Sequence, residues 1–259
     1  MTNGPTVGLD GGVDMPMVGF GTWQVRGDKG YDAIRHALQV GYRHIDTATI
    51  YGNEADVGRA VRDSGLSRTD VFITTKIPPE RAGRERDTLS ASLRALRTEY
   101  VDLWLVHWPP GGQGRPDMWR ALVAARRDGL ARAVGVSNYS TAQIDELIAA
   151  SGETPAVNQI PWSPWDHDPT RLADSRARGV VVEGYSPFKR SKLRDPVLRD
   201  IASTHHVTPA QVVLRWHLEH GIAIIPKSVT PERIKSNMEL FGFTLRAEEI
   251  ARIDALSSR

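Results

Sequence analysis

Residues 41–58 read GYRHIDTATIYGNEADVG and place an aspartate, Asp46, five residues ahead of a tyrosine, Tyr51. The run HID (44–46) predicts the end of a strand, because no apolar period follows until Asn53, a good N-cap, opens a helix. Asp46 then ends a strand and Tyr51 lies in the loop beyond it. In a barrel of alternating strands and helices, active sites lie at such strand ends and in the loops that follow them. Taken alone, the two residues are better explained as a turn cap and a packed loop side chain. The rest of the chain favours a functional site instead.

On either side of this stretch, short apolar runs alternate with segments of helical period. Residues 6–19 predict a hairpin around Asp10-Gly11-Gly12, and eight strands follow, each with a helix-like segment behind it. No linker or change of composition divides them, and a (β/α)8 barrel uses about 250 residues as one unit. We therefore predict a single domain over residues 1–259, a TIM barrel with an N-terminal β-hairpin and a short C-terminal tail. The expected strand ends are Gly21-Thr22, Asp46, Lys76, His107, Ser137-Asn138, Gln159, Tyr185 and Lys227.

Composition excludes several classes of function. The 33 basic and 31 acidic residues leave a formal net charge of +2, which gives no case for nucleic acid or an anionic membrane as a partner. The absence of cysteine excludes disulfides and thiolate chemistry, and the 8 histidines form no HExxH pattern, so we expect no metal. No apolar run approaches the roughly 20 residues that span a bilayer, and no signal peptide is recognisable. We expect a soluble, cytoplasmic monomer.

In a closed barrel the polar strand ends converge on one rim. A phenol has a reference pKa near 10, and a nearby ammonium stabilises the phenolate, so Lys76 is expected to lower the pKa of Tyr51. Asp46 would keep Lys76 charged and aimed, while His107 could hydrogen-bond a substrate oxygen. Singly, His107 would be better explained as a core histidine and Lys76 as a strand-end lysine. Together they predict a general-acid site for an oxygen that becomes negative.

Seven segments in chain order carry a family resemblance. The chain resembles the aldo-keto reductases over nearly all of its length, in particular bacterial members of the 2,5-diketo-D-gluconate reductase type, and it has no Rossmann GxGxxG pattern. This concordance is far more specific than any single motif. The segments are GYRHIDTATIYGNEADVG, TTK, DLWLVHWP, GVSNY, NQI, GYSP and IPKSVTPERIKSN.

The resemblance implies an oxidoreductase that reduces aldehyde or ketone carbonyls to alcohols with NADPH, NADH being possible. It makes Asp46, Tyr51, Lys76 and His107 the catalytic tetrad, with Tyr51 protonating the carbonyl oxygen. It also assigns contacts to the cofactor. Ser137, Asn138 and Gln159 would hold the nicotinamide carboxamide, Tyr185 would stack on the ring, and further contacts would come from Gly21, Thr22, Ser186, Lys227, Ser228, Arg233 and Asn237.

The resemblance also assigns contacts to the far end of the cofactor and to one nearby loop. Lys227, Ser228 and Arg233 would hold the 2′-phosphate. Ser236 stands where the family usually has an acidic residue, so Asn237 remains as the contact for the adenine. The preference for NADPH over NADH stays open. A basic loop after Tyr185 would either fold over the pyrophosphate or be a plain solvated loop. Its cations are Lys189, Arg190, Lys192 and Arg194.

The sequence indicates the walls of the substrate pocket but not the substrate. Trp23 and Trp108 would form apolar walls beside His107, and the short tail would leave the pocket open. Small or medium aldehydes, dicarbonyls and keto-sugars all fit, so the physiological substrate stays open. Two other classes also remain: a cofactor-sensing regulatory subunit of the same fold, and a metal-dependent barrel hydrolase using Asp46 and His107.

Overall fold

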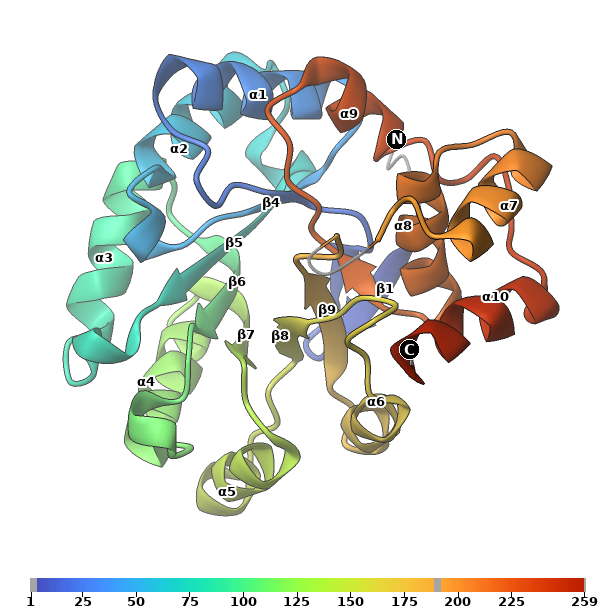
Figure 1. Cartoon of the computed structure of the whole chain (residues 1–259). Coiled ribbons are helices and arrows are strands. Elements are labelled where there is room, and N and C mark those ends of the chain that lie inside the picture. Colours follow the sequence, from blue (N-terminus) through green and yellow to red (C-terminus); the bar gives the residue numbers. More distant parts are fainter. Residues whose placement is uncertain (1–3, 189–191, 259) are drawn as a thin grey trace.

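Eight parallel strands follow one another around one sheet in chain order, from β3 to β10, as the sequence predicts (Figure 1). The structure, a computed structural model, describes residues 4–188 and 192–258. A separate antiparallel hairpin of β1 (Thr6–Leu9) and β2 (Val13–Pro16) precedes the sheet. The strands of the sheet are β3 (Phe20–Gly21), β4 (His44–Asp46), β5 (Phe72–Ile77), β6 (Val101–Val106), β7 (Ala131–Ser137), β8 (Val157–Pro161), β9 (Val181–Tyr185) and β10 (Ala223–Ile224).

The sheet closes on itself where its first and last strands meet. Val18 forms a parallel bridge with Ile224, and Gly19 donates a backbone hydrogen bond of 2.7 Å to the carbonyl of Ile224. A Cβ atom on Gly21 would lie 2.7 Å from the carbonyl oxygen of Ile225, so close packing across this seam requires glycine. The strands therefore form a closed barrel, and their C-terminal ends share one rim.

Helices cover the outside of the barrel between successive strands. The α1 helix begins two residues before the expected Lys29, and α4 and α6 also begin one to two residues earlier than expected. The helices are α1 (Gly27–Gln39), α2 (Glu54–Asp63), α3 (Glu85–Leu96), α4 (Pro116–Arg127), α5 (Thr141–Ser151), α6 (Pro169–Ala177), α7 (Pro196–His205), α8 (Pro209–Glu219), α9 (Pro231–Ser236) and α10 (Ala247–Asp254).

The barrel interior is filled rather than hollow. Leu103 and Leu105 of β6 pack there with Leu9, Val13 and Met15 of the hairpin, which closes the N-terminal end of the barrel. All residues of β6 are buried, as its continuous apolar run predicts. This packing keeps the polar side chains at the strand ends out of the barrel interior and at the C-terminal rim.

Asn53 precedes α2 at the N-cap position as the sequence predicts, but its side chain does not cap the helix. Its amide instead donates to the carbonyls of Thr22 and Val25, at 2.8 and 2.7 Å, and its oxygen accepts from Thr47. Because Asn53, Thr22 and Val25 are buried, these loop carbonyls need a hydrogen-bond partner, and the side chain of Asn53 supplies it. The side chain thus ties together the loops after β3 and β4.

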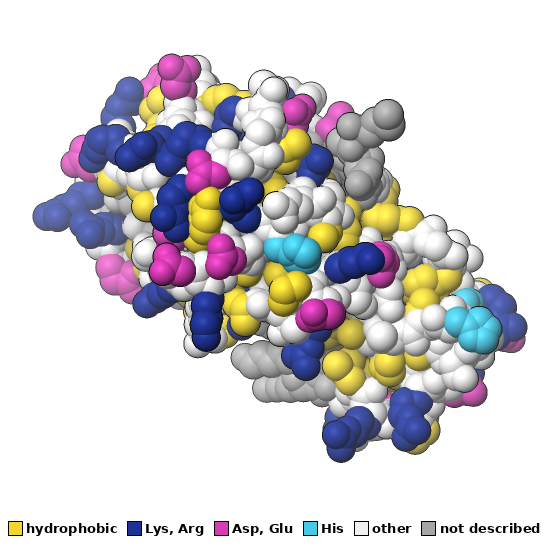
Figure 2. Space-filling model, turned by 90° about the horizontal axis from the view of Figure 1, so that it is seen from above, with side chains coloured by type: hydrophobic (Ala, Val, Ile, Leu, Met, Phe, Trp, Pro, Cys, Tyr) yellow, Lys and Arg dark blue, Asp and Glu magenta, His cyan; other side chains and the backbone are white. Residues whose placement is uncertain are grey.

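The outer surface carries both signs of charge. Figure 2 shows Lys and Arg side chains gathered over α1 to α3, with Asp and Glu among them. On this side the guanidinium of Arg59 lies 3.8 Å from the centre of the Tyr31 ring, whose hydroxyl donates to Asp63. These contacts hold α1 against α2. In the described ranges, no helix has the length and apolar character needed to cross a membrane.

Candidate active site

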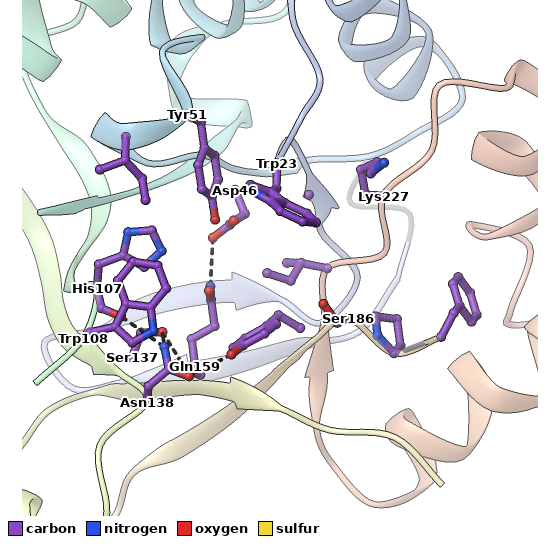
Figure 3. A pocket seen from close by; sticks show the side chains of 16 residues that line it. Trp23, Asp46, Tyr51, His107, Trp108, Ser137, Asn138, Gln159, Ser186 and Lys227 are labelled. Atoms are coloured by element: carbon purple, nitrogen blue, oxygen red, sulfur yellow. Dashed lines mark hydrogen bonds between the residues drawn. The ribbon is translucent and has the colours of Figure 1, made fainter. Parts of the chain in front are cut away.

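A cavity of about 610 Å³ opens at the C-terminal rim of the barrel, and most of the predicted site residues line it (Figure 3). Tyr51 and His107 lie on one side of it in Figure 3, and Trp23 and Lys227 on the other. The strands bring these side chains together from segments far apart in sequence. The predicted residues that line the cavity are Gly21, Trp23, Asp46, Tyr51, His107, Trp108, Ser137, Asn138, Gln159, Tyr185, Ser186 and Lys227.

Lys76 and Asp46 form a buried ion pair beneath the cavity. The ammonium of Lys76 lies 2.7 Å from each carboxylate oxygen of Asp46 and donates to the carbonyl of Thr47 at 2.8 Å. Burial alone lowers the pKa of Lys76, but attraction to Asp46 and other acidic groups outweighs it, so the pKa is raised. Lys76 is therefore a fixed cation at neutral pH, as the sequence predicts.

Tyr51 lies on a short 3-10 helix, Thr49–Tyr51, directly after the loop that follows β4. The Lys76 nitrogen lies 5.1 Å from the centre of its ring. Burial raises the pKa of Tyr51 and exceeds the opposing effect of Lys76, so the net shift is upward, opposite to the lowering expected from Lys76. The phenol consequently holds its proton, while the ammonium stands ready to stabilise the phenolate once that proton leaves.

His107 follows β6 and presents a neutral imidazole to the same cavity. Burial, followed by the charge of Lys76, lowers the pKa of His107 to about 2. Its ring stacks on Trp108, with centroids 3.8 Å apart, and stands edge-on to Tyr51 at 5.7 Å. Its Nδ1 atom is buried without a hydrogen-bond partner in the part of the chain that the structure describes. A ring without charge in this position can exchange a hydrogen bond with a ligand through Nε2.

A network of amide and hydroxyl groups lines the wall next to His107 (Figure 3). Asn138, in the left-handed conformation with φ 65°, donates from its amide to the carbonyl of His107 and to Oγ of Ser137. Its oxygen accepts from the hydroxyl of Tyr185 at 2.8 Å, and Ser137 donates to the carbonyl of Gln159. These bonds fix the wall before any ligand arrives.

The side-chain amide of Gln159 lies between two buried carboxyl groups. Its nitrogen donates to Oδ2 of Asp46 at 2.8 Å and to Oε2 of Glu183 at 2.7 Å. Glu183 is fully buried in β9, and burial, followed by repulsion from Asp46, raises the pKa of Glu183 to about 8. The sequence prediction omitted Glu183, although an acid inside the apolar run VVVEGY is itself a signal.

Five predicted residues do not line the cavity. Lys76 lies beneath it, and Thr22 is buried with its hydroxyl donated to the carbonyl of Asp46 at 2.8 Å. Ser228 precedes α9, Arg233 lies within it and Asn237 is its C-cap residue, and none of the three lines the cavity. In the loop after β9, Lys192 and Arg194 are exposed, whereas Lys189 and Arg190 fall outside the described residues.

Apolar groups complete the rim. Trp23 is 54% exposed and Trp108 40%, and Ile50 and Phe188, which the sequence prediction missed, also line the cavity. Exposed large hydrophobic side chains around a cavity indicate a surface that a ligand covers. No group of acidic and histidine side chains among the described residues is arranged to hold a metal ion.

Three comparisons place the chain among known proteins. The model of the Aldo/keto reductase family matches residues 17–258. Morphine 6-dehydrogenase of Pseudomonas putida is 41% identical over 98% of this chain and 92% of its own length. The 2,5-diketo-D-gluconic acid reductase B of Corynebacterium sp. is 40% identical, over 99% and 94%. The crystal structure of a Bombyx mori aldo-keto reductase in complex with NADP superposes with a TM-score of 0.93 at 31% identity, covering 99% of this chain and 94% of that one.

The match covers the barrel strands and the rim together, so it extends to the segments that carry the site. The chain therefore belongs to the aldo/keto reductase family of NAD(P)H-dependent oxidoreductases.

Proposed function

We propose that this protein reduces the carbonyl group of an aldehyde or ketone to an alcohol with NADPH, and that Tyr51 is the general acid. The observation that carries the proposal is the buried Lys76–Asp46 pair beneath a protonated Tyr51, beside a neutral His107, at the floor of an apolar-walled cavity. This set of groups suits an oxygen that gains negative charge and then a proton.

Each residue of the tetrad has a role that follows from its geometry. His107 donates from Nε2 to the carbonyl oxygen and orients it, and Tyr51 then gives its phenolic proton to that oxygen. Lys76 stabilises the phenolate left behind, while Asp46 holds the ammonium in place and keeps it charged. The nicotinamide supplies the hydride to the carbonyl carbon when the cofactor is bound.

The rim fits a nicotinamide carboxamide. Oε1 of Gln159 has no partner among the described residues, although the nitrogen of the same amide makes two hydrogen bonds. An acceptor left open in this way suits the amino group of a carboxamide. Ser137 and Asn138 lie in the same wall, and Tyr185 offers a half-buried ring to one face.

The adenine end of NADPH would lie toward α9. The side chains of Lys227 and Arg233 are exposed and form no ion pair within the described part of the chain. Two free cations and the hydroxyl of Ser228 suit the 2′-phosphate, which NADH lacks. Asn237, buried at the C-terminal end of α9, is the proposed adenine contact.

The test is the oxidation of NADPH, followed by absorbance, with a panel of aldehydes and dicarbonyls. We expect turnover by the natural chain and a fall in kcat of at least about 100-fold in Tyr51→Phe, with NADPH binding retained. Tyr31→Phe, which removes a surface hydroxyl, is the matched control and should leave kcat unchanged. Binding without turnover by the natural chain would favour a cofactor-sensing regulatory protein, and absence of binding would refute the cofactor assignment.

A further inference from the structure

The orientation of the Gln159 amide is set by two acids from opposite parts of the barrel. Asp46 ends β4, and Glu183 lies inside β9, yet both reach the nitrogen of Gln159, at 2.8 and 2.7 Å. An amide nitrogen has two N–H bonds, so this pair of acceptors uses its whole donor capacity. Only the carbonyl oxygen of the side chain is left for a ligand.

The two acids have different parts in this arrangement. Asp46 is paired with Lys76 and presents a carboxylate, which an amide oxygen cannot approach, so Asp46 selects the nitrogen. Asp46 alone would leave the second N–H free to turn toward the cavity. Glu183 takes this second N–H and holds the amide in one orientation.

Glu183 has little else to do in the structure. It is fully buried, and its Oε1 atom has no hydrogen-bond partner among the described residues. The charged and titratable groups around it are Asp46 beyond Gln159, Lys76 and Tyr51 at the site, and His44, whose Nε2 lies 3.8 Å from Oε1. Burial lowers the pKa of His44 to about 4, so this imidazole is neutral and gives the acid no counter-charge. Burial of an acid costs free energy, and a single hydrogen bond offsets only part of that cost. This cost indicates that Glu183 is retained for its effect on Gln159.

We propose that Glu183 is a positioning residue that, together with Asp46, makes Gln159 a pure hydrogen-bond acceptor and so selects a ligand whose carboxamide donates an N–H. The inference rests on the proposed function, because the ligand in question is the nicotinamide carboxamide. It goes further in assigning the selectivity to an acid that never touches the cofactor. Without Glu183, Gln159 presents both a donor and an acceptor, and the selectivity falls.

Two substitutions of Glu183 and one control distinguish the orientation of Gln159 from a general contribution of Glu183 to the stability of the core. Glu183→Leu removes the acceptor, whereas Glu183→Gln keeps a neutral group with a carbonyl oxygen in the same place. Glu54→Leu is the matched control, because Glu54 is also a buried acid with a raised pKa but accepts from Thr75 on the helix side of the barrel. Thermal unfolding of all three reports any general loss of stability.

The first readout compares two ligands by their dissociation constants. One is NADP⁺, and the other is the analogue in which an acetyl group replaces the carboxamide and therefore donates no hydrogen bond. We expect the natural chain to favour NADP⁺, and Glu183→Leu to reduce this preference by roughly threefold to tenfold, the range for one hydrogen bond. Glu183→Gln and Glu54→Leu should keep the preference of the natural chain.

The second readout needs no ligand, and its pH series uses the natural chain. The side-chain N–H resonances of Gln159, identified by their loss in Gln159→Glu, are followed in the natural chain as pH rises. One of the two protons should move as Glu183 ionises, because it is bonded to that acid. The same proton should lie at a different shift in Glu183→Leu.

The outcomes are distinct. A reduced preference in Glu183→Leu, with rescue by Glu183→Gln, supports the proposal, and an unchanged preference overturns it. Gln159 resonances that ignore both pH and the leucine substitution overturn it as well, even if no nicotinamide ligand binds. Failure of the natural chain to bind NADP⁺ or NADPH, with the expected resonance shifts, would refute the proposed function but keep Glu183 as the residue that orients Gln159.

Discussion

The ammonium of Lys76 lies 2.7 Å from both carboxylate oxygens of Asp46, and neither side chain is more than marginally exposed. Two charges removed from water in this way are retained only if each compensates the other. The pair joins β4 to β5 directly beneath Tyr51, so the same contact that satisfies the buried cation also fixes its distance from the phenol. Stability and chemistry therefore depend on one interaction.

Replacement of Asp46 by asparagine should destabilise the protein most at neutral pH. In the natural chain the raised pKa of Lys76 contributes stability at pH values below its unfolded pKa, and this contribution is lost as pH rises through the folded value. In Asp46→Asn, the main attraction that opposes burial is lost, and the weaker effects of Tyr51 and Glu183 remain, so the charged lysine becomes less favourable. We expect a loss of roughly 3–5 kcal/mol at pH 7 that shrinks as pH approaches about 11.

Urea unfolding at several pH values measures this difference. Asp128→Asn is the control, because Asp128 pairs with Arg86 at the surface, where an ion pair is worth about 1 kcal/mol or less. A loss in Asp46→Asn that is equally large at pH 7 and pH 11 would contradict this account of the pair.

His107 and Tyr51 predict a flat pH profile for carbonyl reduction. The pKa of His107 lies at about 2, and that of Tyr51 is raised, so neither group changes its charge near neutrality in the free enzyme. We expect kcat/KM for an uncharged carbonyl to stay level between about pH 5 and pH 7, below the pH at which Glu183 ionises, since this ratio reports groups of the free enzyme.

The pH profile of the variant His107→Gln shows whether ionisation of His107 determines the pH dependence of the natural chain. The variant should lose on the order of 100-fold in kcat, as for one lost oxyanion donor, but keep the same flat profile. An acidic limb near pH 6.5 in the natural chain that disappears in His107→Gln would show a titrating imidazole instead.

Most of the fold could be read from the sequence because the barrel repeats one simple pattern. Fully buried strands such as β6 read as continuous apolar runs, and the eight strands appear in the sheet in chain order. Asn53 shows the limit of local reasoning. Its residue type and position fit an N-cap, but the need of buried carbonyls at Thr22 and Val25 decides where its side chain goes, and this need exists only in the folded barrel.

The site was predictable to the extent that strand ends mark it. Polar residues at or next to the ends of β4, β5 and β6 converge because parallel strands share one rim, whereas Gln159, expected at a strand end, is the middle residue of β8. Glu183 was missed because it lies inside its strand rather than at the end, so that rule does not cover it. The sign of the Tyr51 pKa shift was also missed, since it depends on how deeply the ring is buried, which no spacing reveals.

The phosphate contacts proposed for Lys227 and Arg233 predict a loss confined to NADPH. Lys227→Met and Arg233→Met should each raise the dissociation constant of NADPH by roughly tenfold, the lower end for a charge-assisted hydrogen bond, because both side chains are exposed. The dissociation constant of NADH, which lacks the 2′-phosphate, should change by less than about twofold. Fluorescence titration of both nucleotides measures the effect.

Lys235→Met is the matched control for these two substitutions. Lys235 is exposed on the same helix, α9, but its ammonium lies 3.7 Å from Glu239 and faces a carboxylate. Its replacement should leave the affinity for either nucleotide unchanged. Equal losses of affinity for NADPH and NADH in Lys227→Met or Arg233→Met would contradict the assignment of the 2′-phosphate to these two residues.

Glu183 makes the stability of the protein depend on pH in a direction opposite to that of an ordinary salt-bridged acid. Its pKa, about 8 in the folded chain against an ordinary 4.5, means that the folded state holds a proton which the unfolded state has already released. Stability from this residue is therefore present below about pH 4.5 and falls as pH rises to 8. Glu183→Gln cannot ionise and should be free of this loss. We expect the variant to match the natural chain near pH 4.5 and to exceed its free energy of unfolding by a few kcal/mol at pH 9.

Denaturant unfolding of the two proteins at intervals across this range measures the gap. The comparison removes one carboxyl, and titrating groups distant from it cancel in the difference, whereas its neighbours Asp46, Lys76 and Tyr51 respond to its loss. Glu54→Gln provides a reference for a buried acid whose hydroxyl partner, Thr75, lowers the pKa that burial raises. A gap for Glu183→Gln that stays constant from acid to alkaline pH would mean that Glu183 is ionised in the folded barrel, with Lys76 shared between two carboxylates rather than held by Asp46 alone.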